Sequence, residues 1–140
     1  MRGSDGFSLV EMLVVVAILS ILAIGATLPF SRGSASVAGD AGALEQAADG
    51  LRSLAMISDR PRALALNPGG WQAERRSGEG WAAEGAPMAF AAATASLAGD
   101  ELSRIVFLPD GRAFGPDVLL DAPGTAMRCT VAEGRLRCAP

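Results

Sequence analysis

The feature that most constrains this chain is an apolar segment near its N-terminus, GFSLVEMLVVVAILSILAIGATLPF, which runs from Gly6 to Phe30. Between Met12 and Leu28 only a serine, a glycine and a threonine interrupt it. As a helix this stretch would extend roughly 26 Å, close to the thickness of the hydrocarbon core of a bilayer. A buried core helix of a soluble protein is the alternative, which the lack of any polar face makes less favourable. We therefore expect residues 7–30 to form a transmembrane helix.

One acid, Glu11, lies near the start of this apolar segment. An isolated carboxylate in the apolar part of a membrane is costly, so it should have a cationic partner. If the chain were cut between Gly6 and Phe7, the new amine on Phe7 would lie about one helical turn before Glu11. The amine of a neighbouring subunit would neutralise both charges and fix the register between two helices. We therefore expect Glu11 to specify assembly.

A secretory signal peptide is a second interpretation of the N-terminus, because Ser36–Gly39 (SVAG) offers small residues at a possible cleavage site. Signal peptides begin with a positively charged region. Here the single arginine before the apolar run is balanced by Asp5 and Glu11. The signal-peptide interpretation is therefore the weaker one.

The composition argues against an enzyme. The 140-residue chain has no His, all twelve of its basic residues are Arg, and its net charge is -3. It has no phosphate-binding glycine loop, and its two cysteines are not spaced as metal ligands. Asp110, Asp117 and Asp121 are candidates to hold a cation together, but solvated turn acids are the favoured interpretation. We expect no catalytic residues, no metal and no cofactor. The negative net charge also argues against a protein that coats nucleic acid through its overall charge.

Beyond Pro29, residues 31–39 are small and polar and read as a linker. Asp40 is the expected N-cap of a second helix over Ala41–Ser58. An apolar face at helical spacing (Leu44, Ala48, Leu51 and Ala55) requires a sheet to cover it. For Leu51, Leu54 and Ile57 we expect core packing rather than a partner groove.

The remainder reads as short strands separated by turns. ALALN, WQAER and WAAE each end at a cluster of Gly, Pro or Ser, which is typical of a meander. Ile105–Leu108 is a further strand that enters a Pro109–Gly111 turn. Trp71 and Trp81 are expected to pack on the sheet rather than form a binding surface. The stretch Met88–Ala98 has no pattern that places it.

The C-terminal segment MRCTVAEGRLRC predicts a hairpin with Glu133 and Gly134 at its turn. That register places Cys129 opposite Cys138 in a non-hydrogen-bonded pair, where side chains approach closely enough for a disulfide. Closing this loop would stabilise the fold by roughly 2 to 3 kcal/mol. Such a bond requires an oxidising compartment. Two buried free thiols are the alternative.

The N-terminal residues carry a resemblance to a known family. The pattern G-F-S-L-V-E, from Gly6 to Glu11, followed by a long apolar helix and a proline, resembles the leader and first helix of type IV pilins and type II secretion pseudopilins. The resemblance implies that residues 1–6 are a leader and that a prepilin peptidase cleaves after Gly6 and N-methylates Phe7. It also implies insertion in the inner membrane, in contact with lipid, and packing of the helix in a filament core.

The rest of the chain resembles the globular domain of H-type minor pseudopilins, the GspH/FimT-like group, through a helix followed by strands and the aromatic-Leu-Pro-Asp-Gly turn at Phe107–Gly111. This resemblance implies an α+β fold, in which a long N-terminal transmembrane helix is followed by a small antiparallel β-sheet domain over residues 40–140 in the periplasm. The implied function is that of a minor subunit of the pseudopilus. Its partners would be other pseudopilins and the inner-membrane assembly platform.

A minor pilin of a type IV pilus, acting in pilus assembly or DNA uptake, is the alternative function. Its sequence feature is GRLR, Gly134–Arg137, which resembles a short basic motif of the DNA-binding FimT-like branch. The hairpin register places Arg128, Arg135 and Arg137 on one face. DNA is an expected partner only under this alternative, because three phosphate contacts make a weak, salt-dependent site. A solvated strand face is the simpler interpretation.

Overall fold

The computed structural model describes residues 9–26, 35–97 and 103–140. The chain divides into two compact units, Met1–Arg32 and Gly33–Pro140. Among the described residues, the first unit contains α1 (Leu9–Ala26), and the second contains α2 (Val37–Ser58) and all the strands. The strands are β1 (Arg62–Asn67), β2 (Gly70–Ser77), β3 (Gly80–Ala83), β4 (Met88–Ala89), β5 (Thr94–Leu97), β6 (Ser103–Phe107), β7 (Ala113–Phe114), β8 (Val118–Ala122), β9 (Thr125–Ala132) and β10 (Arg135–Ala139).

Helix α1 is apolar on every side, with Glu11 as the acid in its first turn. Its large apolar side chains between Leu9 and Ile18 are exposed within the chain. Within the residues that the structure describes, no helix combines the length and the apolar character needed to cross a membrane. The expected span over residues 7–30 extends beyond the described residues at both ends.

Helix α2 begins at Val37, four residues earlier than Ala41, which is its expected first residue. Its N-cap is Ser36, whose side-chain oxygen accepts a hydrogen bond from the backbone N–H of Gly39 at 3.1 Å. The prediction that Asp40 is the cap is therefore wrong, because Asp40 lies inside the first turn and uses its carboxylate elsewhere. The helix ends at Ser58, and its C-cap, Asp59, adopts a left-handed conformation.

The expected apolar face of α2 is confirmed, because it is buried against the strands; its members are Val37, Ala41, Leu44, Ala48, Leu51 and Ala55. The expectation that Leu54 and Ile57 join this core is wrong. Both side chains are exposed, Ile57 to 83% of its surface. Helical geometry explains this difference, since Leu54 and Ile57 lie to one side of the Leu51–Ala55 stripe and face away from the sheets.

The strands form two antiparallel sheets rather than a single one. One sheet has the order β3-β2-β1-β6-β7, with β4 also paired to β2, and the other has the order β10-β9-β8-β5. The expected meander is present as the consecutive pairs β1–β2 and β2–β3. The turn between β6 and β7 is closed by a hydrogen bond from Gly111 N–H to the Leu108 carbonyl. Each β-ladder of the described strands is antiparallel.

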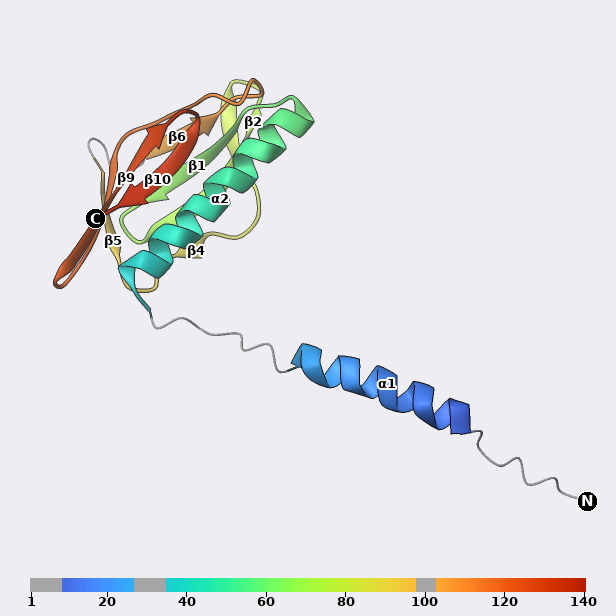
Figure 1. The fold of residues 1–140 in the computed structure, drawn as a ribbon. Helices are drawn as coiled ribbons and strands as arrows, with labels where there is room; N and C mark the ends of the chain where they lie inside the picture. Colours follow the sequence, from blue (N-terminus) through green and yellow to red (C-terminus); the bar gives the residue numbers. More distant parts are fainter. Residues whose placement is uncertain (1–8, 27–34, 98–102) are drawn as a thin grey trace, which may run out of the picture. The chain divides into compact units, whose positions relative to one another are not determined.

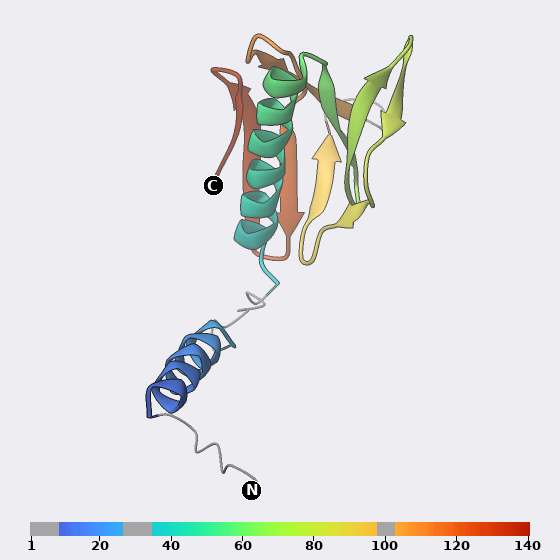
Figure 2. The same ribbon diagram turned by 90° about the vertical axis from the view of Figure 1, so that its right-hand side faces the viewer.

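Helix α2 lies over strands of both sheets and holds them together (Figures 1 and 2). The core is formed by α2 and the inward residues of β1, β6, β8, β9 and β10, among them Leu64, Phe107, Leu120 and Leu136. The segment that the sequence leaves unplaced contains the short strand β4 and the edge strand β5. Gly33–Pro140 is therefore an α+β unit, in agreement with the predicted fold class.

Candidate functional site

The residues expected at the N-terminal processing site are only partly described. Gly6 and Phe7 lie outside the described residues. Glu11 lies in the first turn of α1 and is exposed.

The two cysteines form a disulfide between adjacent strands. Cys129 of β9 lies directly opposite Cys138 of β10, which is the register that the sequence predicts for this hairpin. Their sulfur atoms are joined, with nine residues separating the two positions. Cys129 is fully buried, whereas Cys138 is partly exposed and lies on an edge strand beside α2.

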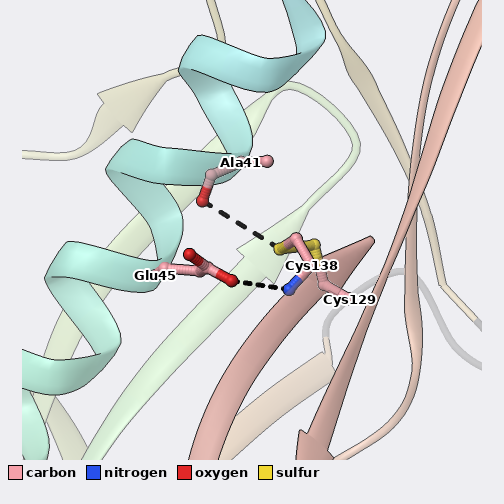
Figure 3. The surroundings of a disulfide bond; sticks show 4 residues. All are labelled: Ala41, Glu45, Cys129 and Cys138. Atoms are coloured by element: carbon pink, nitrogen blue, oxygen red, sulfur yellow. Dashed lines mark hydrogen bonds between the residues drawn. A yellow bond between two sulfur atoms is a disulfide. The ribbon is translucent and has the colours of Figure 1, made fainter. Parts of the chain in front are cut away.

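Helix α2 contributes two oxygen atoms to the surroundings of Cys138 (Figure 3). The carboxylate Oε1 of Glu45 accepts a hydrogen bond from the backbone N–H of Cys138 at 2.6 Å. The carbonyl oxygen of Ala41 lies 4.0 Å from the Cys138 sulfur. Because a disulfide sulfur carries no proton, this second approach is a packing contact and not a hydrogen bond.

Glu45 also satisfies a backbone donor that the sheet leaves open. In a non-hydrogen-bonded pair the N–H of each residue points away from its partner strand. The N–H of Cys138 therefore points to the free edge of β10, where α2 covers it. Covering an edge in this way prevents pairing with a foreign strand. No local sequence signal identifies this role, because Glu45 and Cys138 are 93 residues apart in the chain.

Asp40 is the buried acid of the described residues and anchors the segment before β5. It is only 7% exposed. Its carboxylate accepts hydrogen bonds from three consecutive backbone N–H groups, those of Ala91, Ala92 and Ala93, at 2.9, 2.8 and 2.8 Å. Burial alone would raise the pKa of Asp40, but the three N–H donors together hold this pKa below its usual value. Asp40 thereby fixes the stretch that the sequence leaves unplaced.

The β6–β7 turn, the β9–β10 turn and α2 meet at a single backbone carbonyl. The Nε of Arg52 donates to the carbonyl oxygen of Gly111 at 2.9 Å. The hairpin turn at Gly134 packs against the same carbonyl. The glycine of the GRLR motif is thus required by packing between the β6–β7 and β9–β10 turns, whatever the arginines that follow it bind.

The arginines of the hairpin lie on its exposed face, as their alternation with the cysteines predicts. Arg128, Arg135 and Arg137 are all exposed. Two of them face acids: Arg128 lies 4.0 Å from Asp117, and Arg137 lies 3.8 Å from Asp49 of α2. These pairs are exposed and contribute little to stability, but they lower the positive potential of the face.

The other sequence candidates have structural roles. Asp110 forms hydrogen bonds with the backbone and side chain of Arg112, and these lower the pKa of Asp110. Across the described ranges, no group of three potential metal ligands comes together. Trp71 packs against the core. The guanidinium carbon of Arg76 lies over the ring of Trp81, 5.5 Å from the centre of that ring.

Residues 1–27 match the family model described as "Prokaryotic N-terminal methylation motif". No curated protein and no solved structure matches the chain. The motif is the prepilin signal of type IV pilin-like proteins, which are structural rather than enzymatic, and it supports a type IV pilin or pseudopilin family. It indicates processing by a prepilin peptidase, assembly with other pilin-like subunits and anchoring in the inner membrane through the N-terminal segment.

Proposed function

We propose that this chain is an H-type minor pseudopilin that is incorporated into the pseudopilus of a type II secretion system. In this proposal a prepilin peptidase removes residues 1–6 and methylates Phe7. Residues 7–30 anchor the subunit in the inner membrane and pack in the filament, with residues 40–140 in the periplasm. The observation that carries the proposal is the methylation motif over residues 1–27, within which the apolar helix α1 lies.

The surface of α2 supports incorporation into an assembly. Every exposed residue of this helix is uncharged: Ala38, Gly39, Gly42, Ala43, Gln46, Gly50, Ser53, Leu54, Met56 and Ile57. A helix on the surface of a monomeric protein normally presents charged residues to solvent. Small residues on such a face allow another helix to approach closely, as in helix packing within membranes.

The charged residues of α2 support the same conclusion, because they are directed toward the sheets. Asp40 binds the N–H groups that precede β5, Glu45 binds Cys138, and Arg52 binds Gly111. Asp49 faces Arg137. The helix therefore directs its charges to contacts with the strands, of which the Asp49–Arg137 pair is partly exposed, and its outward face is left uncharged for a neighbouring subunit.

The disulfide supports a periplasmic location for the domain. Bonds between cysteines form and persist in oxidising compartments, and Cys129 and Cys138 are bonded here. Export of residues 40–140 across the inner membrane would place them in such a compartment.

Two measurements test the proposal. Mass spectrometry of the mature protein should find an N-terminus at methylated Phe7, whereas a product that begins near Gly39 would indicate a soluble secreted domain. Deletion of the gene should abolish type II protein secretion, and the wild-type gene should restore it. Intact secretion together with a loss of pilus assembly or DNA uptake would instead establish the type IV pilus alternative.

A FimT-like minor pilin that takes up DNA is the second candidate, and the exposed face of Arg128, Arg135 and Arg137 favours it. Asp117 and Asp49 stand beside two of these arginines and oppose phosphate binding. Under this candidate, duplex DNA should bind weakly and lose affinity steeply as salt rises. The change Arg135→Ala should weaken binding to all sequences about equally, and an unchanged affinity would reject the candidate.

A further inference from the structure

The disulfide lies beside a negative charge whose effect on the stability of the bond toward reduction is not part of the proposed function. Glu45 places a carboxylate oxygen 2.6 Å from the backbone nitrogen of Cys138, and Ala41 places a carbonyl oxygen 4.0 Å from the sulfur of the same residue. Both oxygens come from adjacent turns of α2 and point toward Cys138 (Figure 3).

We propose that Glu45, with the carbonyl of Ala41, protects the Cys129–Cys138 disulfide against reduction by anionic thiols. The two sulfurs differ in access, since Cys129 is fully buried and Cys138 is partly exposed. Because Cys138 is the more exposed residue of the pair, we expect a reductant to attack its sulfur, and the carboxylate of Glu45 binds the backbone of this same residue. Glu45 acts as a positioning and screening residue and takes no part in bond exchange.

The chemistry of exchange explains why a negative charge at this place matters. A thiolate attacks the Cys138 sulfur, forms a mixed disulfide and expels Cys129 as a thiolate. A second thiolate, from a second molecule of a monothiol or from the other end of a dithiol, then attacks the reductant's sulfur in the mixed disulfide, expels Cys138 as a thiolate and leaves the reductant as a disulfide. Both protein thiolates finally take up a proton from water. A fixed carboxylate beside Cys138 opposes the approach of the first anion and the release of the last one.

The nearby charges leave the carboxylate of Glu45 effective. The neighbouring cation, Arg137, alternates to the other face of β10 from Cys138 and lies 3.8 Å from Asp49. Asp49 therefore offsets Arg137, and Glu45 remains the charge that an incoming thiolate meets.

The test measures reduction rates of the full-length protein in detergent with three small thiols of different charge: anionic mercaptoethanesulfonate, neutral mercaptoethanol and cationic cysteamine. Glu45→Gln keeps an oxygen that can accept the Cys138 N–H and removes the charge. We expect this change to accelerate reduction by the anionic thiol about threefold or more, and reduction by the cationic thiol least. Each rate is compared as a second-order constant for the thiolate form of the reagent.

The matched control is Asp59→Asn, which removes one acid from the far end of α2, about 20 Å along the helix from Glu45. It should leave all three rates unchanged. Should Glu45→Gln fail to fold, the wild-type protein gives the same answer: added salt should bring the anionic and cationic rates closer together. The proposal would be overturned if Glu45→Gln accelerated reduction equally with all three thiols or not at all. It would also be overturned if the wild-type rates did not depend on thiol charge and salt.

Discussion

Gly134 lies so close to the carbonyl oxygen of Gly111 that a β-carbon added to Gly134 would stand 2.3 Å from that oxygen. The same carbonyl accepts a hydrogen bond from Arg52 of α2. The contact therefore joins the β9–β10 turn, the β6–β7 turn and the helix at a single backbone group. It ties together elements of both sheets, which otherwise share α2 as their common cover.

Replacement of this glycine gives the first prediction. Gly134→Ala should destabilise the domain by about 3 kcal/mol or more, since it combines an unfavourable positive φ with a forced separation of the two turns. Gly124→Ala is the matched control: Gly124 also has a positive φ, but nothing lies within 4 Å of an added β-carbon. It should cost only about 1 to 2 kcal/mol. Denaturant unfolding compares the two, and equal losses would show that the contact with Gly111 is unimportant.

The second prediction concerns the anchor formed by Asp40. Asp40→Ala would leave three backbone N–H groups without their acceptor. We expect a loss of about 2 to 4 kcal/mol in the free energy of unfolding and faster amide exchange at residues 91–93. Asp121→Ala, which removes an exposed acid from β8, should change neither quantity appreciably. Unchanged exchange at residues 91–93 in Asp40→Ala would contradict the anchoring role.

The third prediction follows from the lowered pKa of Asp40. A carboxyl group with a lower pKa in the folded state stabilises the fold above its unfolded pKa, about 3.9 for Asp, and loses this contribution as the pH falls through the folded value. Stability should therefore decrease below about pH 4. Asp40→Asn should be less stable near neutral pH but should lose less stability as the pH falls below about 4. Parallel pH profiles of wild type and variant would show that another group is responsible.

The fourth prediction tests assembly through Glu11. Glu11→Ala should leave leader cleavage and the folded α+β unit intact, because both depend on other residues. Incorporation into the filament should fail, since an amine would lack its counter-charge in an apolar setting, a loss of about 1 to 3 kcal/mol or more. Glu11→Gln should be milder, because it can still accept a hydrogen bond. Crosslinking in detergent measures the outcome, and undiminished crosslinks to a subunit above would refute the pairing.

The fifth prediction tests the uncharged outward face of α2. Ser53 is exposed on this face and bonds back to the carbonyl of Asp49. Ser53→Glu should leave the unfolding midpoint nearly unchanged and reduce crosslinking to neighbouring subunits, because it buries a charge in the proposed contact. Thr125→Glu, an equivalent change at an exposed position of β9, serves as the control. Equal crosslinking in both variants would exclude this face from the assembly.

The sequence by itself determined the features that depend on short-range order. Helical spacing identified the buried face of α2 through Leu44, Ala48 and Leu51, because residues three and four apart share one face of a helix. The Glu133-Gly134 turn determined that Cys129 lies opposite Cys138, because a two-residue turn sets the register of both strands. The methylation motif is likewise a contiguous pattern, and it lies within residues 1–27.

Only the tertiary structure decided how the charges of α2 are used. Asp40, Glu45 and Arg52 bind backbone groups that lie 51, 93 and 59 residues further along the chain. Periodicity does not distinguish an acid that faces solvent from one that faces an unpaired N–H, because the acceptor and donor meet only after both sheets have formed. For the same reason the sequence predicts Asp40 as the helix cap, because the backbone groups that it binds are distant in the chain, whereas the structure has Ser36 as the cap. The outward face of α2 is uncharged as a consequence, because the charged side chains of the helix bind groups on the strands and turns, and no local sequence pattern reveals these contacts.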